Sequence, residues 1–533
     1  MDSLRHVPPP AVLSALSRPE LEALLIELFG EVAALKQTII DLREEIARLK
    51  GLKGRPTIKP SGMDQGTEPP KPGKREKRPG RGKVTPRVSI DEKVIEAKVP
   101  PGSRFKGYES FLVQDLVISV RATCYRRERW ITPDGRTVLA PLPEGTAGHF
   151  GPELRRFVLM QYHQGQSTLP RLLAFLRSVG VSISKRQLQR LLTDKQDDFV
   201  TEAQAVPRAG LETSPFVSVD DTGARHAGKN GFCTQIGNDW FTWFGTRSSK
   251  SRLNFLDLLR AGHTDYVLND AAYRYMREHS LSATLIARLA AEPETRFTDR
   301  AAWLAHLDRL GFNGLKVTPD PIQVASEGAL WGSVQSHGFL CDGVVLSDDA
   351  GQFNVGRHAL CWVHAERLVH KLNAFTDKHR AAQQRVRGLM WDFYAGLKVY
   401  RSKPGKRQAL ALRARFDRIF RRRTGFATLD RLPARLHANK ADLLMVLERP
   451  EIPLHTNGSE NDIRCYVTRR KVSAGTRSEI GRDCRDALLG LAKTCAKLGI
   501  EVWDYLGSRL VVAGHAMIEP LDHYVRAHTR YAS

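Results

Sequence analysis

Two pairs of adjacent aspartates follow short apolar runs in this chain. Asp220–Asp221 comes directly after Phe216–Val219, and Asp348–Asp349 comes directly after Val344–Ser347. Short β-branched runs of this kind predict buried strands. A carboxylate at a strand end faces solvent in a cleft and can bind an oxygen-loving cation. A single Asp pair more often caps a strand or a turn, so it is the repetition that indicates a site.

A third acidic group, Glu460, lies within Leu454–Arg464, where Asn457 or Ser459 can cap a helix that begins near the glutamate. A carboxylate in the first helical turn can point into the cleft where the two strand ends meet. Two strand-end aspartates and one helical glutamate would hold two Mg²⁺ ions about 3.5–4 Å apart. One ion activates the attacking oxygen, and the other stabilises the leaving 3′ oxygen of an in-line displacement at phosphorus.

Other chemistries are less well supported. Cys361 and His364 have C-x-x-H spacing, but no fourth ligand follows at a suitable spacing, so a packed helix with satisfied histidines is favoured over a zinc site. Nothing marks Tyr466 as the nucleophile of a tyrosine recombinase. A Walker-type phosphate-binding loop is absent from the sequence, which argues against an ATP-driven function.

The chain that carries these residues is long and basic. Its 533 residues suffice for roughly three or four domains, and 41% apolar residues exclude wholesale disorder. Lys and Arg number 82 against 58 Asp and Glu, and the net charge of +24 indicates a polyanionic partner, most often nucleic acid. Seven cysteines without any C-x-x-C, no signal-peptide pattern and no long apolar run predict a cytoplasmic, nucleoid-associated protein without membrane contact.

Residues 1–50 carry a heptad repeat. The a positions of the repeat are Leu25, Val32, Ile39 and Ile46, and the d positions are Leu28, Leu35, Leu42 and Leu49. β-Branched residues at most a positions with Leu at d favour a parallel two-stranded coiled coil, so we expect a homodimer or higher oligomer through residues 21–49. A single helix docked on its own protein is the alternative.

Residues 51–90 form a basic linker rich in Pro and Gly, which predicts a chain lying along phosphates. Its proposed DNA contacts are Lys74, Arg75, Lys77 and Arg78. A basic-zipper protein is disfavoured because its basic helix precedes the zipper and lacks proline.

Two segments precede the carboxylates. Residues 91–147 are predicted to be a small β-rich domain because apolar residues alternate in Phe111–Val120. Residues 151–200 are predicted to be a helical DNA-binding region. There, one helix stops at Gly180 and a second is capped by Ser182 or Ser184, as in a helix-turn-helix. The second helix offers Lys185, Arg186, Gln187 and Arg190 to DNA. Many helical hairpins look alike without touching DNA.

Residues 210–520 are predicted to form the α/β domain around the carboxylates, with helical insertions at about 261–335 and 357–447. In the second insertion, Leu412, Phe416 and Ile419 fall on one helix face. Arg415, Arg418 and Arg422 fall on another, which suits a helix along a DNA backbone, a solvated charged face being the alternative. Further candidate phosphate contacts follow Glu460: Arg464, Arg469, Arg470 and Lys471.

Four groups of residues together resemble a known family. They are Asp220-Asp221-Thr222, Ser347–Ala350 with Phe353, Cys361–Arg367, and Asn457–Arg464 with Arg470-Lys471. This order is similar to that of the large transposase subunit of the insertion-sequence-sixty-six family, and the similarity runs from about 151 to 510. The resemblance implies a bacterial DDE transposase with a ribonuclease H-like catalytic core, preceded by a coiled coil and a helix-turn-helix-like DNA-binding region.

Carried over by position, the family's triad falls on Asp220, Asp348 and Glu460, which would be both the catalytic and the metal-binding residues. Asp221 and Asp349 stay open as replacements for their neighbours. The resemblance implies two Mg²⁺ ions, with Mn²⁺ as a substitute. Family members usually carry a zinc-finger-like Cys-x-x-Cys segment before the helical region, whereas only Cys124 stands there here. We therefore expect no structural zinc.

These features predict a transposase whose partners are double-stranded DNA, both transposon ends and target, and accessory proteins of the same element. It would cleave the ends and join the 3′-OH to target DNA. Two alternatives remain: a nuclease of the same fold that never joins strands, and a catalytically inactive DNA-binding protein derived from a transposase.

Overall fold

The computed structural model describes residues 89–143, 148–313 and 317–531, together with Ser17, Glu22, Leu25, Phe29, Gly30 and Val32. The chain divides into two compact units, residues 1–62 and 63–533, and the second unit holds nearly all of the described residues.

Two sequence predictions fall largely outside the described residues. They are the coiled coil through residues 21–49 and the basic linker with Lys74, Arg75, Lys77 and Arg78. The coiled coil and the linker therefore stay predictions.

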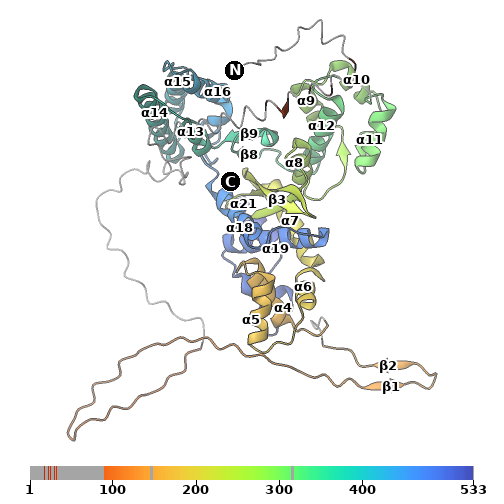
Figure 1. Ribbon diagram of the computed structural model, residues 1–533, viewed down its shortest axis with the longest axis vertical. Coiled ribbons are helices and arrows are strands. Elements are labelled where there is room, and N and C mark those ends of the chain that lie inside the picture. The colour runs from red at the N-terminus through yellow and green to blue at the C-terminus, as the bar shows by residue number, and fades with distance from the viewer. Residues whose placement is uncertain are drawn as a thin grey trace, which may run out of the picture. The chain divides into compact units, whose positions relative to one another are not determined.

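A five-stranded mixed sheet forms the centre of the second unit (Figure 1). Its strands are β3 (Phe216–His226), β4 (Lys229–Gly237), β5 (Thr242–Arg247), β8 (Val344–Ser347) and β9 (Arg357–Leu360). The order is β5-β4-β3-β8-β9, with antiparallel pairing from β5 to β3 and parallel pairing from β3 to β9. All four residues of β8 are buried, as expected for a strand covered on both faces.

The two faces of the sheet bury different residues. Val217 and Val219 pack into the largest core. On the opposite face, Phe216 packs with Val344 and Leu346 of β8. Because side chains alternate along a strand, Asp220 and Asp348 share the face of Phe216 and Leu346.

Helices surround this sheet and form two groups inserted between its strands. Before the sheet stand α4 (Pro152–His163), α5 (Leu169–Ser178), α6 (Lys185–Thr193) and α7 (Asp197–Thr213). The first group comprises α8 (Arg252–Leu259), α9 (Asp270–Glu278), α10 (Ala283–Ala290), α11 (Arg300–Arg309) and α12 (Pro321–Ser336), with the short strands β6 (Tyr266–Val267) and β7 (Arg296–Phe297).

The second group follows β9 and has a core of its own. It comprises α13 (Trp362–His370), α14 (Asp377–Ser402), α15 (Lys406–Phe420), α16 (Ala427–Ala438) and α17 (Lys440–Leu443). The chain then continues through α18 (Asn457–Ser473), α19 (Glu479–Lys497), α20 (Val502–Arg509) and α21 (Leu521–Tyr531). Among the described residues, no helix combines the length and apolar character that crossing a membrane requires.

The prediction of a β-rich domain over 91–147 is wrong for most of that segment. Its described residues contain only the hairpin of β1 (Arg129–Ile131) and β2 (Thr137–Leu139). Phe111–Val120, which alternates as a strand would, is not one, and its apolar side chains are exposed. Alternation specifies which face a strand buries, but a strand also needs a hydrogen-bonding neighbour, which this segment lacks among the described residues.

His163, at the end of α4, is buried, and neither of its ring nitrogens has a hydrogen-bond partner among the described residues. Burial, with smaller contributions from the charges of Arg469 and Arg485, lowers the pKa of His163 from 6.5 to about 3. Between pH 6.5 and about pH 3 the His163 ring binds a proton in the unfolded chain but not in the folded protein. The free energy of unfolding therefore falls by about 1.4 kcal/mol for each pH unit below 6.5.

We expect the change of His163 to Phe to make the protein more resistant to acid. Relative to its value at pH 8, the stability difference between variant and wild type should shift in favour of the variant by about 2–3 kcal/mol at about pH 4.5. Urea unfolding of both proteins at the two pH values measures the shift. A stability difference that is the same at both pH values would contradict a depressed pKa at His163.

Candidate active site and nucleic-acid surface

Asp220 lies within β3, and Asp348 directly follows the neighbouring parallel strand β8. Ser218 of β3 pairs with Leu346 of β8, so each aspartate stands two residues beyond this pair. Burial raises the pKa of Asp220 to about 7; the hydrogen bond from the Asp221 N–H opposes this rise, and the negative charge of Asp348 adds to it. The two carboxylates are thus close enough to repel each other when both are charged.

Glu460 stands in the first turn of α18, the helix that packs on the same face of the sheet. Ile463 and Tyr466 of α18 are buried against Ala224 and Cys233, which share that face with Asp220. The Glu460 carboxylate accepts a 2.8 Å hydrogen bond from Arg367 Nη1. Its Oε1 also lies 3.4 Å from His364 Nε2.

His364 connects the three carboxylates electrostatically. Burial lowers the pKa of His364, but the hydrogen bond with Cys361 and the charges of Asp348 and Glu460 outweigh burial, so the net pKa is raised. The positive charge of His364 in turn lowers the pKa of Asp220. Asp220, Asp348 and Glu460 therefore all interact electrostatically with one imidazole, and Glu460 also contacts it directly.

The aspartates next to the triad positions have other partners. Asp221 forms an ion pair with Lys250 and accepts a 2.7 Å hydrogen bond from Gln352. Asp349 accepts hydrogen bonds from Arg435 at 2.5 Å and from Asn439 at 3.2 Å. Of each pair, the first aspartate is the better candidate ligand, because the carboxylate of the second is already engaged.

Within the described residues, no three His, Cys, Asp or Glu side chains stand close enough together to hold one metal ion. The donor chemistry still fits a hard divalent cation, because Asp220 and Asp348 are carboxylates on one face of the sheet, each two residues beyond the paired Ser218 and Leu346. Glu460 is turned toward Arg367, whose guanidinium supplies positive charge beside it.

Arg367 and His364 belong to this cluster but were not predicted as parts of it. Both were visible in Cys361–Arg367, which begins directly after β9 and so at the edge where the carboxylates gather. Spacing of three residues puts them on one helix face, and they are 3.3 Å apart. Treating the C-x-x-H pattern only as a zinc motif hid this arrangement.

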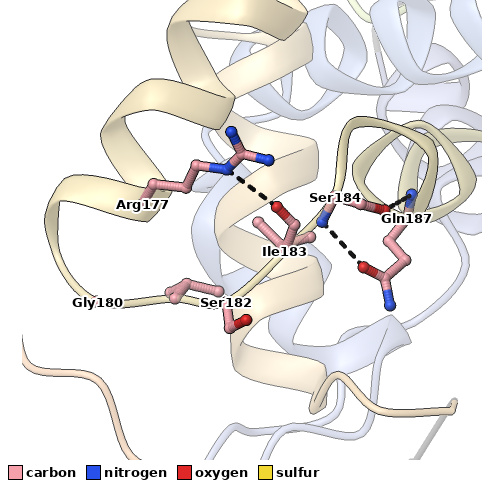
Figure 2. Close-up of a pocket in the computed structure, with 7 residues that line it drawn as sticks. Arg177, Gly180, Ser182, Ile183, Ser184 and Gln187 are labelled. Carbon is pink, nitrogen blue, oxygen red and sulfur yellow. Dashed lines mark hydrogen bonds between the residues drawn. The ribbon is translucent and has the colours of Figure 1, made fainter.

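A helical hairpin formed by α5 and α6 offers a second surface (Figure 2). Its turn contains Gly180, which has a φ of +97°, and is closed by a side-chain hydrogen bond in which Arg177 Nε donates to the Ile183 carbonyl at 3.1 Å. Ser184 caps α6, because its hydroxyl accepts the N–H of Gln187 at 3.2 Å. The prediction of two helices with a serine cap is confirmed for Ser184.

On α6 the exposed side chains are Lys185, Arg186, Gln189 and Arg190. Gln187 is half-buried, and its side-chain oxygen accepts the Ser184 N–H at 2.9 Å (Figure 2). The prediction that Gln187 reads DNA bases therefore needs correction, because the capping box uses its amide oxygen. Gln189, which the sequence analysis did not select, is the exposed amide on this helix.

One predicted phosphate contact is wrong. Arg469 is fully buried, stacks on the Tyr162 ring at 3.6 Å, and donates to the carbonyls of Tyr162 and Ser167 at 2.8 Å each. It joins α18 to the end of α4 and cannot reach DNA. Its dense basic surroundings in the sequence gave no sign that it points inward.

The remaining basic candidates lie at or near the surface. Arg464 and Lys471 are exposed, whereas Arg470 is half-buried and donates to the carbonyl of Gly223, three residues after Asp220 in β3. On α15, Arg418 is exposed and Arg415 half-buried, and Arg422 is exposed just after the helix. The apolar stripe predicted opposite them is confirmed, since Leu412, Phe416 and Ile419 are buried.

Comparison with known proteins identifies the family. Residues 333–483, which include Asp348, His364 and Glu460, match the family described as Transposase IS66 family. An uncharacterized protein named y4jO from Sinorhizobium fredii (strain NBRC 101917 / NGR234) is 50% identical over 319 residues, which cover 60% of this chain and 98% of that protein. With this match and the sheet-edge carboxylates, the chain belongs to the IS66 family of transposases.

Proposed function

We propose that this chain binds the ends of its insertion sequence and catalyses metal-dependent DNA cleavage and strand transfer, with Asp220, Asp348 and Glu460 as the metal-binding triad. The observation that carries the proposal is the register of β3 and β8, in which the two aspartates follow a paired position on adjacent parallel strands. Glu460 reaches the same sheet face from α18.

The sheet order supports a ribonuclease H-like core. Three antiparallel strands, β3 to β5, continue into the parallel strands β8 and β9, with α18 packed on the carboxylate face. The long helical group α13–α17 lies in sequence between the second aspartate and the glutamate. The two aspartates would thus stand just beyond the point where the parallel pairing of β3 and β8 ends.

Two divalent cations, Mg²⁺ or Mn²⁺, would supply an activated water and stabilise the leaving 3′ oxygen when bound by these carboxylates. Arg367 and His364 hold Glu460 at the sheet edge through the contacts described above. Arg470 supplies a fixed positive charge near the scissile phosphate, because it is anchored on the backbone of β3. No covalent protein–DNA intermediate is required, since the carboxylates bind metal and do not attack.

DNA would be held by basic side chains on several elements. Their charge complements phosphate, and the net charge of +24 supports extended contact. In the basic linker the proposed contacts are Lys74, Arg75, Lys77 and Arg78, and on α6 they are Lys185, Arg186, Gln189 and Arg190. Further proposed contacts are Arg415, Arg418 and Arg422 at α15 and Arg464, Arg470 and Lys471 on α18. Dimerisation through residues 21–49 would bring two ends together.

A strand-transfer assay tests the proposal. The purified full chain is incubated with Mg²⁺, a supercoiled target plasmid and a labelled duplex that carries the inverted repeat flanking the gene and a free 3′-OH. We expect labelled plasmid, and we expect an uncut end to be nicked at the repeat boundary. A matched duplex with a blocked 3′ end should give no joined product.

Cleavage without joined product would support the alternative of a nuclease. Specific binding without cleavage in Mg²⁺ or Mn²⁺ would support the alternative of an inactive DNA-binding protein. Either result would overturn strand transfer as the function.

A further inference from the structure

One short segment of the second helical group, residues 435–442, contacts the residues on both sides of Asp348. On the C-terminal side, Arg435 and Asn439 donate to the two carboxylate oxygens of Asp349, at 2.5 Å and 3.2 Å. On the N-terminal side, Asp442 is linked to Ser347 through His358. The segment thus contacts Asp349 directly and Ser347 through His358, and none of these bonds uses the Asp348 carboxylate.

Asp349 has an unusual backbone conformation. Its φ is +76°, in the left-handed region that residues other than glycine rarely occupy. Such a conformation persists only where surrounding contacts fix it. The hydrogen bonds from Arg435 and Asn439 are such contacts, because they engage both carboxylate oxygens of Asp349 from the C-terminal end of α16.

The contact before Asp348 is buried. The Ser347 hydroxyl lies 2.8 Å from His358 Nε2, and His358 Nδ1 lies 3.2 Å from Asp442 Oδ2. The same hydroxyl accepts the N–H of Asp349 at 3.4 Å. Although this is a Ser-His-Asp chain, Ser347 has no exposed surface, so it cannot meet a substrate and serves to hold the strand end.

Residues 435–442 are also held by contacts with α15. Asp417 of α15 lies 2.9 Å from His437 and 2.8 Å from Lys440, both within residues 435–442. Residues 435–442 are therefore fixed between the basic helix α15 and the loop that carries Asp348.

We propose that residues 435–442, with Arg435 as the main contact, position Asp348 by holding Asp349 in its left-handed conformation. The inference rests on the proposed function in that Asp348 binds metal. Arg435 is a positioning residue: it acts through Asp349 and touches no reacting group. Without it, Asp349 relaxes toward an ordinary backbone conformation and carries Asp348 out of register with Asp220.

The first test is the change of Arg435 to Ala in the full chain. We expect kcat for end cleavage to fall about tenfold while KM for DNA stays within about twofold, because Asp348 is displaced but DNA contacts remain. Hydrogen exchange of the Asp349 and Ala350 amides should speed up in the absence of metal and DNA, since these amides bond to Ser347 Oγ and Asp348 Oδ1. Arg431→Ala is the matched control: Arg431 lies one turn earlier on α16, is exposed, and has no bond to the loop among the described residues.

The second test is rescue. Glycine adopts positive φ without steric cost, so Asp349→Gly added to Arg435→Ala should return kcat to within about threefold of wild type. Rescue by glycine distinguishes backbone positioning from a direct contact of Arg435 with DNA, which glycine at 349 could not replace.

Unchanged amide exchange and unchanged kcat in Arg435→Ala would overturn the proposal. Loss of kcat that Asp349→Gly fails to restore would also overturn it. If the wild type cleaves no DNA, the proposed function fails, but the exchange measurement still tests the positioning of the loop.

Discussion

Changing Glu460 to Gln, or Asp220 to Asn, is expected to lower DNA cleavage by at least about a thousandfold while binding of transposon ends stays within about threefold. Each change removes a proposed metal ligand but keeps the size and most hydrogen bonds of the side chain. The effect is therefore concentrated in the transition state, where the ligands act. Single-turnover cleavage in saturating Mg²⁺, with end binding measured separately in Ca²⁺, separates the two quantities.

The matched control is Asp221 to Asn. This residue is adjacent to Asp220, but its carboxylate is paired with Lys250 and bonded to Gln352 on the other face of β3. We expect cleavage by this variant to fall far less than in Asp220→Asn. Full cleavage by Glu460→Gln would refute the triad, and equal losses at positions 220 and 221 would leave the choice of aspartate unsupported.

Removing Arg186 and Gln189 together should weaken binding to the true transposon end by about 1–3 kcal/mol, or roughly five- to 150-fold, for each side chain that reads a base. Both side chains are exposed on α6 and have no side-chain hydrogen bond or ion pair within the described part of the chain, so the fold should be unaffected. Binding to random DNA should weaken much less. Competition binding of Arg186→Ala/Gln189→Ala against both DNAs at several salt concentrations measures the difference.

Arg418 and Arg422 provide the comparison, because we propose that they contact the DNA backbone, and phosphate contacts carry no sequence information. Changing both to Ala should weaken binding to both DNAs alike. The slope of log affinity against log salt concentration should flatten by about 0.9 for each phosphate that is no longer neutralised. If the α6 variant loses affinity equally for both DNAs, the helix does not read sequence.

The aspartates could be placed from the sequence because local patterns were enough. Each pair follows a run too apolar and β-branched to be anything but a buried strand. The prediction that the first strand ends at Asp220 is wrong, because β3 continues to His226 in its pairing with β4. Asp220 stands instead just beyond the end of the parallel pairing between β3 and β8. The register of the two strands, in contrast, depends on how β3 and β8 pair across more than a hundred residues. For that reason the sequence could not decide between Asp220 and Asp221, or between Asp348 and Asp349, as metal ligands. The partners of Asp221 and Asp349, which are Lys250 and Arg435, favour the first aspartate of each pair.

Side-chain direction was the main point that the sequence could not supply. Arg469 and Lys471 look alike in a basic run, yet one is buried against Tyr162 and the other is exposed. Gln187 and Gln189 differ in the same way, although the S-x-x-Q spacing from Ser184 could have identified the capping residue in advance. Phe111–Val120 failed for another reason: a strand requires a partner, and alternation does not provide one.

The locked turn of the α5–α6 hairpin has a thermodynamic consequence for recognition. The reciprocal bonds of Ser184 and Gln187, together with the bond from Arg177 to Ile183, hold the start of α6 in one conformation without DNA. If α6 reads DNA as proposed, little backbone conformational entropy is lost on association, and contacts from Arg186 and Gln189 would count almost fully toward affinity. In that case the helix could not adapt to a mismatched base by shifting its backbone, and each mismatch would keep its full energetic penalty.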